Sequence, residues 1–307
     1  MIIAAGLSPA WQSVMRFSSL TPGEVNRATA TWSCASGKVL NVAVALRHLG
    51  ADCRAVTVLG GPPAVSTEGE FAALGIDLVA VPTHATTRTC TTLLDDATGR
   101  TTELVENAAA ITDAEQRAFV TAYADAVASA KVAVLSGSLP AGTPHTLYRE
   151  LMAVTPCPVV LDARGPELLA ALGEKPLLVK PNREELARTV GATITCDEEL
   201  FAAMEQLRSL GALWVVVTDG PRPISVVGPE GRCRLFPPPL DSVENPIGSG
   251  DCLAAGFAVA IGNGQAPVDA LRYGIACATE NCRSLFAGRL DRERVSAWAS
   301  QIVIEPR

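Results

Sequence analysis

The fold is predicted from one stretch, Asn245-Pro246-Ile247-Gly248-Ser249-Gly250-Asp251, and from the apolar run at residues 252–261 that follows it. The run predicts a buried helix. Because glycine has no Cβ, Gly248 and Gly250 let the backbone approach a ligand closely where the helix starts, and free N–H groups there attract negative charge. Asp251 either caps the helix or receives a proton from a substrate, and the stretch alone leaves both interpretations open.

Two common nucleotide motifs are absent from the chain. Leu253 occupies the last glycine position of a dinucleotide-binding G-x-G-x-x-G. The only Gly-Lys pair, Gly37-Lys38, is followed by Val39, and Trp32 stands where the first glycine of a P-loop belongs. A nucleotide would therefore have to be bound by another motif.

The composition indicates a globular enzyme, because 48% of the 307 residues are hydrophobic and 19% are charged. The nine cysteines have neither disulfide nor zinc spacing, so we expect reduced thiols and a cytoplasmic location. The net charge of −7 gives no reason to expect nucleic acid as a partner. The first residues do not resemble a signal peptide, and no apolar stretch approaches the about 20 residues of a membrane span, so we expect no membrane association.

Strands and helices alternate along most of the chain. Buried strands are predicted at residues 2–7, 54–61, 77–81, 132–136, 159–162, 177–180 and 214–218. Helices are predicted at residues 38–49, 67–74 and 112–130, between the later strands and three times near the end, and Thr112 with Glu115 has the pattern of a capping box. This order predicts an α/β fold with a mostly parallel sheet covered by helices on both faces.

A smaller sheet is predicted beside the main one. Residues 89–94 and 100–105 form the clearest hairpin, and a β-prone piece from Ala28 to Trp32 is expected to pair with it, after a polar, irregular segment that follows Ala10. The two segments of this lid are expected at about residues 8–34 and 86–107. Without an internal repeat or a flexible linker, residues 1–307 are expected to form a single domain.

Three polar stretches follow predicted strands, at residues 136–142, 180–185 and 218–220. Each stretch by itself could be an ordinary turn that is rich in Gly, Pro and Asn. Because ligands of open parallel sheets bind beyond the carboxyl ends of the strands, the three stretches together with residues 248–251 indicate one ligand site.

Five motifs occur in a characteristic order: Gly37-Lys38 with Asn41, Thr87-Arg88, Gly137-Ser138-Leu139-Pro140, Lys180-Pro181-Asn182-Arg183-Glu184-Glu185 and Gly248-Ser249-Gly250-Asp251. In this order they resemble the ribokinase-like (pfkB) carbohydrate kinases over nearly the whole chain. The resemblance implies a three-layer α/β/α sandwich with a small β-sheet lid. Residues 23–27, 161–165 and 178–186 are most similar to the branch that contains 1-phosphofructokinase and tagatose-6-phosphate kinase.

The resemblance implies that ATP, as its Mg²⁺ complex, phosphorylates a sugar hydroxyl. Asp251 would be the general base, and the backbone N–H groups of residues 248–251 would form the anion hole. Asn182 and Glu185 would organise magnesium and phosphate, with Glu185 holding the metal through water. The further positions implied for the nucleotide are Lys180, Thr218, Gly220 and Asn281.

On the acceptor side, the resemblance implies that Arg27, Lys38 and Arg88 hold a phosphate that the sugar already carries. Asn41 would bond sugar hydroxyls, and Ser138 would lie near the acceptor. The likeness is less regular here. The departures from the family pattern are Ser36 and Val39 in place of glycines around Gly37, Gln12 in place of an aspartate, and Cys90 in place of an asparagine.

The leading hypothesis is a kinase of a ketohexose phosphate, with fructose 1-phosphate or fructose 6-phosphate as the acceptor and tagatose 6-phosphate next. A kinase of an unphosphorylated sugar or nucleoside on the same fold is an alternative. A third hypothesis, which Gln12, Val39 and Cys90 suggest, is a sugar- or nucleotide-binding protein that has lost catalysis. The resemblance also implies a homodimer through the lid and allows a monovalent cation beside Mg²⁺.

Overall fold

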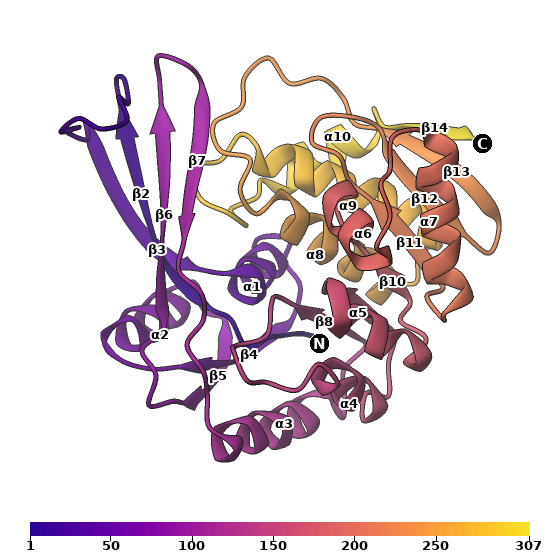
Figure 1. Ribbon diagram of the computed structural model, residues 1–307, viewed down its shortest axis with the longest axis horizontal. Coiled ribbons are helices and arrows are strands. Elements are labelled where there is room, and N and C mark those ends of the chain that lie inside the picture. Colours follow the sequence, from indigo (N-terminus) through magenta and orange to yellow (C-terminus); the bar gives the residue numbers. More distant parts are fainter.

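The computed structural model describes residues 1–307, and its main sheet has ten strands (Figure 1). Seven neighbouring strands run parallel, as the alternation of strands and helices predicts. In spatial order they are β5 (Asp77–Pro82), β4 (Cys53–Leu59), β1 (Ile2–Ala5), β8 (Val132–Ser136), β9 (Val159–Asp162), β10 (Leu178–Val179) and β11 (Trp214–Val217). The antiparallel strands β12 (Ile224–Gly228), β13 (Gly231–Phe236) and β14 (Val303–Pro306) complete one edge.

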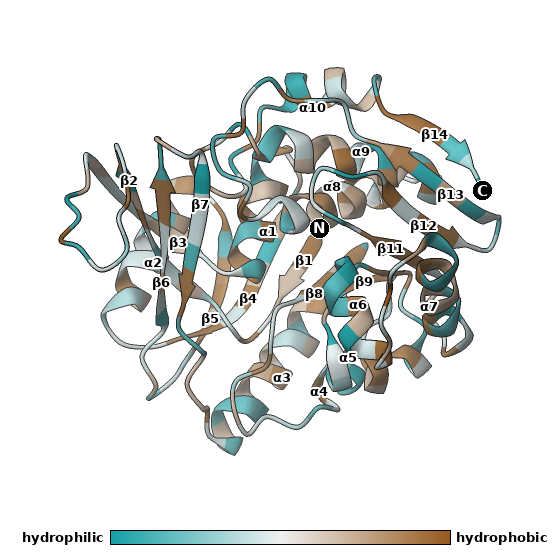
Figure 2. Cartoon of the chain, turned by 45° about the horizontal axis from the view of Figure 1, so that its top comes forward, coloured by the Kyte–Doolittle hydropathy of each residue, from teal (hydrophilic) through white to brown (hydrophobic).

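Helices cover both faces of the main sheet, so each face has its own hydrophobic core. One core is built with α1 (Lys38–His48), α2 (Pro62–Leu74), α8 (Ser249–Gly262), α9 (Pro267–Asn281) and α10 (Arg292–Ala299). The other core is built with α3 (Asp113–Val127), α4 (Leu147–Ala153), α5 (Gly165–Ala171), α6 (Arg183–Val190) and α7 (Asp197–Ser209). Figure 2 shows hydrophobic residues along the central strands between these two helical layers. This is the predicted three-layer arrangement.

Helix α8 is the most deeply buried helix of the site, with every residue from Asp251 to Ala260 buried. Glycines permit its close contact with α9. A Cβ on Gly256 would lie 2.9 Å from the Cα of Gly274, and a Cβ on Gly274 would lie 2.6 Å from the carbonyl oxygen of Leu253. Because the two backbones meet at these glycines, with the side chain of Cys277 packed against Gly256, α8 is held firmly against the core.

A separate four-stranded sheet stands beside the main sheet (Figure 1). Its spatial order is β3 (Ala30–Ser36), β2 (Ala10–Phe17), β6 (Arg88–Asp95) and β7 (Arg100–Val105). The predicted hairpin is confirmed as β6 and β7. Strand β2 pairs antiparallel with β3 and parallel with β6, so one face of this sheet can cover the ends of the main strands.

Three local predictions differ from the structure. The segment predicted to be irregular after Ala10 forms strand β2. Buried and partly exposed residues alternate along most of this strand, but polar and apolar residues do not, because the polar Gln12 is buried. Helix α2 begins at Pro62 rather than Thr67, because proline is well suited to a first turn. Strand β14 was not predicted, and it exists because β13 offers an edge to pair with. None of the helices has the length and apolarity that a membrane crossing needs.

Candidate active site

A cavity of about 650 Å³ lies where the parallel strands end and the small sheet begins. It brings together most of the predicted site residues, which come from seven separate segments of the chain. Those that line it are Gln12, Gly37, Lys38, Asn41, Arg88, Cys90, Ser138, Lys180, Asn182, Glu185, Thr218, Gly248, Ser249, Gly250 and Asp251. Arg27, Gly220 and Asn281 do not line it.

Asp251 lies in the first turn of α8, and only 5% of it is exposed. Its Oδ2 accepts a hydrogen bond from Nδ2 of Asn41 in α1, at 2.7 Å. Burial raises the pKa of Asp251 to about 6, and the nearby carboxylate of Asp162 adds to the rise, although Lys38, Asn41 and Lys180 oppose it. A carboxylate that binds a proton this readily is suited to act as a general base near neutral pH.

The glycines of the loop before α8 stand where a side chain would meet close neighbours. Gly248 caps the helix with φ 83°, a left-handed conformation that favours glycine. A Cβ on Gly248 would clash with Ala287, and a Cβ on Gly250 would lie 2.9 Å from Nζ of Lys180. The backbone N–H groups at this helix start therefore lie next to a cation and open into the cavity.

Asn281 supports this loop from behind. It is completely buried, and its Nδ2 donates to the carbonyl oxygen of Ile247 at 2.9 Å and to Oγ of Ser249 at 3.1 Å. Its Oδ1 accepts from the backbone N–H of Gly288 at 3.0 Å and from Sγ of Cys252 at 3.2 Å. The implied contact with adenine or ribose would break these bonds, so in this structure Asn281 holds the glycine loop in place.

Asp162, at the end of β9, connects the two predicted lysines. Its carboxylate is 3.1 Å from Nζ of Lys38 and 3.5 Å from Nζ of Lys180. Burial by itself would raise the pKa of Asp162, but the two lysines hold it below its usual value. Burial would lower the pKa of Lys38, yet Asp162 and Asp251 raise it. Lys38 therefore stays charged, and Asp162 fixes the positions of both lysines.

Asn182 and Glu185 cap the start of α6 reciprocally. Oδ1 of Asn182 accepts from the backbone N–H of Glu185 at 2.8 Å, and Oε2 of Glu185 accepts from that of Asn182 at 3.0 Å. The other oxygen of Glu185 lies 3.5 Å from Nη1 of Arg164. No group of three or more His, Cys, Asp or Glu side chains could hold a metal ion. One carboxylate in a wide polar cavity suits Mg²⁺ that keeps most of its waters and binds phosphates.

The acceptor half of the cavity is built by the small sheet and α1. Nε2 of Gln12 donates to Oγ1 of Thr92 at 2.8 Å, and Gln12 pairs across the strands with Cys90. Gly37, with φ 86°, starts α1 so close to β2 that a Cβ would lie 2.8 Å from the carbonyl oxygen of Ser8. Three of the departures from the family pattern, Gln12, Ser36 and Cys90, therefore line this half of the cavity, whereas Val39 is buried in the core.

Arg88 is the cation of this half that forms no ion pair. Its guanidinium donates only to backbone carbonyl oxygens, those of Ser8 at 3.0 Å, Pro9 at 3.3 Å and Glu106 at 2.9 Å. Carbonyl groups orient the guanidinium without neutralising its charge. The guanidinium is therefore held in place without a bonded carboxylate, although Glu103, which also lines the cavity, is close enough to interact with its charge.

Two predicted site residues lie elsewhere. Arg27 lies in the connection between β2 and β3, ahead of Ala30 and so at the end of the small sheet away from the cavity. Gly220 lies in the turn between β11 and β12, with φ 57°, next to the cavity residue Thr218. Their predicted roles remain predictions.

The sequence analysis did not assign site roles to several residues that line the cavity, above all Asp162 and Arg164. Their position at the end of the predicted strand 159–162 could have placed them in the site, because ligands of open parallel sheets bind beyond the carboxyl ends of the strands. Ser8, Glu103 and Asn107 also line the cavity. Nothing in the spacing of these three residues points to a shared site.

The small sheet also contacts the loop that leads to α8. Nη2 of Arg16, on β2, forms an ion pair with Glu244, and its Nε lies 3.6 Å from Asp96. The next residue, Asn245, accepts a hydrogen bond from the backbone N–H of Ile247 at 3.1 Å. A short chain of contacts thus runs from the small sheet to the glycine loop.

Comparisons with known proteins agree with this geometry. The model of the pfkB family carbohydrate kinases matches residues 9–289. A 1-phosphofructokinase of Xanthomonas campestris pv. campestris is 30% identical, over 98% of this chain and 97% of its own length. These matches bear out the likeness that the sequence motifs indicate.

Solved structures confirm the fold. A possible 1-phosphofructokinase from Thermotoga maritima superposes with a TM-score of 0.92 at 20% identity, covering 100% of both chains. Phosphofructokinase-2 from Escherichia coli, in complex with potassium, superposes with a TM-score of 0.89 at 24% identity, covering 98% of this chain and 99% of that one. The chain therefore belongs to the pfkB family of carbohydrate kinases and is an ATP-dependent sugar kinase.

Proposed function

We propose that this kinase phosphorylates a hydroxyl of a ketohexose phosphate, with fructose 1-phosphate as the first candidate and fructose 6-phosphate and tagatose 6-phosphate as alternatives. The observation that carries the proposal is that the buried Asp251 and the unpaired cation Arg88 line the same cavity. A neutral sugar would leave the charge of Arg88 without a partner. The relative in Xanthomonas campestris, a 1-phosphofructokinase, supports this choice of acceptor.

Asp251 is the proposed general base. Its carboxylate would take the proton of the acceptor hydroxyl as that oxygen attacks the γ-phosphorus of ATP, and the bond to the β-phosphate would break to release ADP. Asn41 orients the carboxylate through its 2.7 Å hydrogen bond. The backbone N–H groups of residues 248–251 and Nζ of Lys180 would stabilise the charge on the transferred group.

Glu185 and Asn182 are the proposed residues for the metal, held through water. Mg²⁺, when bound with ATP, neutralises charge on the phosphates. The fixed cap at the start of α6 keeps the carboxylate of Glu185 in the cavity. On the acceptor side, Gln12 would present its amide oxygen to sugar hydroxyls, because its Nε2 is already bonded to Thr92.

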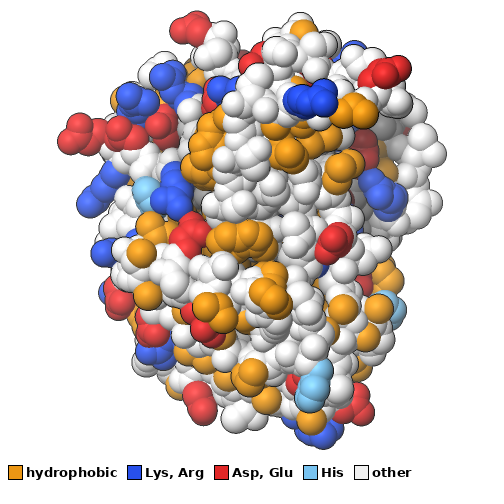
Figure 3. All heavy atoms as spheres, turned by 90° about the vertical axis from the view of Figure 1, so that its left-hand side faces the viewer, with side chains coloured by type: hydrophobic (Ala, Val, Ile, Leu, Met, Phe, Trp, Pro, Cys, Tyr) orange, Lys and Arg blue, Asp and Glu red, His pale blue; other side chains and the backbone are white.

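We further propose that residues 1–307 act as one domain whose lid comprises about residues 8–34 and 86–107. The lid would also be the interface of a homodimer. Val25 is 81% exposed, Leu104 55% and Val105 54%. Figure 3 faces this side of the molecule and shows hydrophobic side chains among the charged ones. Association of two lids would remove this apolar surface from water.

Replacing the proposed base tests the mechanism directly. In Asp251→Asn, kcat should fall by about 100- to 10,000-fold, the usual contribution of a general base, while ATP still binds. ADP release in the presence of fructose 1-phosphate measures the first effect, and calorimetry with ATP measures the second. Asp269→Asn is the matched control, because Asp269 is also in the first turn of a helix but lies outside the cavity. Retention of most activity in Asp251→Asn would disprove the assignment.

The raised pKa of Asp251 predicts how activity and stability depend on pH. The carboxylate must be free of a proton, so kcat/KM should fall as the pH drops through about 6. The folded-state pKa lies above the ordinary value of 3.8, so the ionised group destabilises the fold above pH 6 and has no such effect below pH 3.8. Asp251→Asn should therefore raise the melting temperature at pH 8 but not at pH 3.5. An equal effect at both pH values would contradict the burial of the charge.

Replacing Arg88 separates phosphorylated from neutral acceptors. Arg88→Ala should raise KM for the ketohexose phosphate by about 10- to 100-fold, because a charge-assisted hydrogen bond is lost, and should leave KM for MgATP unchanged. Arg100→Ala is the control, since Arg100 is an exposed arginine of the same sheet that does not line the cavity. A neutral sugar that is used equally well by Arg88→Ala and the native enzyme, with no phosphosugar turnover, would indicate the alternative acceptor.

Oligomeric state tests the lid interface. Light scattering should show a dimer for the native chain and a monomer for Leu104→Glu, because a buried charge would oppose association. Val303→Glu is a matched control, since Val303 is also 55% exposed but lies on β14, in the main sheet. A native chain that is monomeric at the concentrations of the assay would rule the interface out.

A further inference from the structure

Four cationic side chains line the cavity, and two of them are already neutralised. Lys38 and Lys180 share the buried carboxylate of Asp162. The other two are arginines. Arg88 forms no ion pair, and Arg164 has one carboxylate neighbour, Glu185, at 3.5 Å without a hydrogen bond. The two arginines are therefore the cations of the cavity that no carboxylate holds by a hydrogen bond, and each guanidinium keeps N–H groups free for a ligand.

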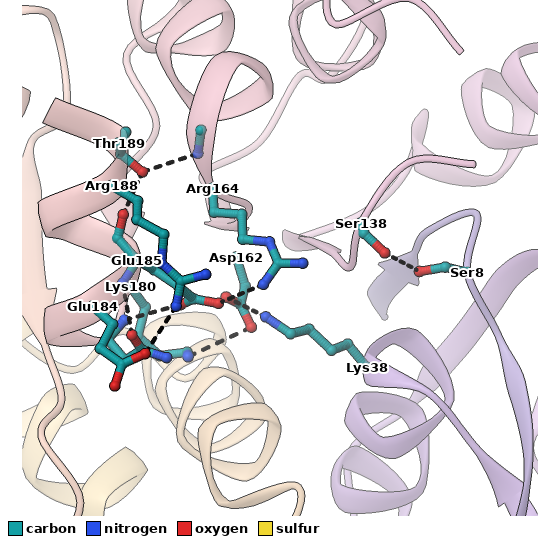
Figure 4. Close-up of polar contacts among 12 residues, drawn as sticks. Ser8, Lys38, Ser138, Asp162, Arg164, Lys180, Glu184, Glu185, Arg188 and Thr189 are labelled. Atoms are coloured by element: carbon teal, nitrogen blue, oxygen red, sulfur yellow. Dashed lines mark hydrogen bonds and ion pairs between the residues drawn. The ribbon is translucent and has the colours of Figure 1, made fainter. Parts of the chain in front are cut away.

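Arg164 lies between the central cavity and a second cavity beside it. The second cavity, of about 350 Å³, shares Asn107, Gly137, Ser138, Ala163 and Arg164 with the first. The side chain of Arg164 is 58% exposed, and it makes no capping hydrogen bond at the start of α5. Figure 4 shows it extended toward the space between Lys38 and Ser138. Apart from the ion pair with Glu185, Arg164 has no side-chain contact that involves its charge.

The wall between the two arginines is continuous. Nη2 of Arg88 donates to the carbonyl oxygen of Ser8 at 3.0 Å, and Oγ of Ser138 donates to Oγ of the same Ser8 at 3.4 Å. Ser138 and Arg164 line both cavities. An anion seated at this wall would therefore have a guanidinium on either side and a serine hydroxyl between them.

The charges support an anion at this place. A phosphate monoester carries close to two negative charges at pH 7, and Arg27, the third cation expected for it, does not line the cavity. The second cavity also contains Glu167, whose carboxylate lies 3.4 Å from Nδ1 of His145. One arginine alone would leave part of the charge of the phosphate unmatched.

We propose that Arg164 is the second phosphate-binding arginine of the acceptor site, opposite Arg88, and that it makes the enzyme select phosphorylated over free ketohexoses. The proposal rests on the proposed function. It assigns a substrate-specificity role to a residue that otherwise only faces Glu185.

Steady-state kinetics of Arg164→Gln and Arg164→Lys test the proposal. ADP release is measured with fructose 1-phosphate, fructose 6-phosphate and free fructose, at varied MgATP. In Arg164→Gln, KM for the phosphosugar should rise by about 10- to 100-fold, while KM for MgATP and for fructose stays unchanged. Arg164→Lys should recover part of the loss, because the charge returns without the planar donors.

The control is Arg188→Gln, since Arg188 lies on α6 with 70% of its side chain exposed and is paired with Glu184 outside the cavity. It should leave every constant unchanged, and circular dichroism checks that each variant is folded. If Arg164 acts only on Glu185, Arg164→Gln will change KM for MgATP and the Mg²⁺ requirement, and KM for the phosphosugar will stay constant. That result would overturn the proposal.

A binding measurement keeps the inference separate from the proposed function. Calorimetry without ATP measures the affinity of the native chain and of Arg164→Gln for fructose 1-phosphate and for inorganic phosphate. If the native enzyme turns over no phosphosugar, the proposed function fails. A weaker affinity of Arg164→Gln would still support the anion site, and equal affinities of the two proteins would disprove it.

Discussion

The backbone between Ile247 and Asp251 must pass three neighbours at once, and the site depends on this constraint. It runs beside Asn41, Lys180 and Ala287 at distances that leave no space for a Cβ on Gly248 or Gly250. Asn281 then fixes the loop from behind through two hydrogen bonds, to the carbonyl oxygen of Ile247 and to Oγ of Ser249. Because these contacts hold the loop on the side away from the cavity, its N–H groups are oriented before any ligand arrives, which is the condition for strong electrostatic stabilisation.

Two buried carboxylates of the site have opposite pKa shifts, and their surroundings explain the difference. Asp162 touches two lysines, and they hold its pKa low despite burial. Asp251 touches only the neutral amide of Asn41, so burial dominates and raises its pKa to about 6. One carboxylate is thereby suited to stay charged and hold lysines in place, and the other to exchange a proton.

The small sheet contributes both to the acceptor half and to the glycine loop. It carries Gln12, Arg88 and Cys90 into the cavity, and through Arg16 it contacts Glu244 at the entrance to the loop. Exposed ion pairs are weak individually, about 0–1 kcal/mol each. The pair therefore contributes more to the position of the sheet against the loop than to the stability of the fold.

Local chemistry was enough to predict several elements of this protein. Alternating apolar runs and helix patterns predicted the parallel strands, the buried α8 and the capping box of Thr112 and Glu115, because each depends on neighbours in sequence. Glycines next to an aspartate at a helix start predicted a site at the strand ends. Most of the residues expected there do line one cavity.

Other features depended on contacts between distant segments. Strand β2 was missed because its polar Gln12 faces a cavity instead of water, and β14 because only the edge of β13 makes it a strand. The inward orientation of Asn281, the distance of Arg27 from the cavity and the pairing of Asp162 with two lysines all arise from packing across the sheet. The sequence determines which residue types are present and how far apart they lie along the chain. Only the tertiary fold decides which of them share one buried, low-dielectric site, where neighbouring charges shift each other's pKa.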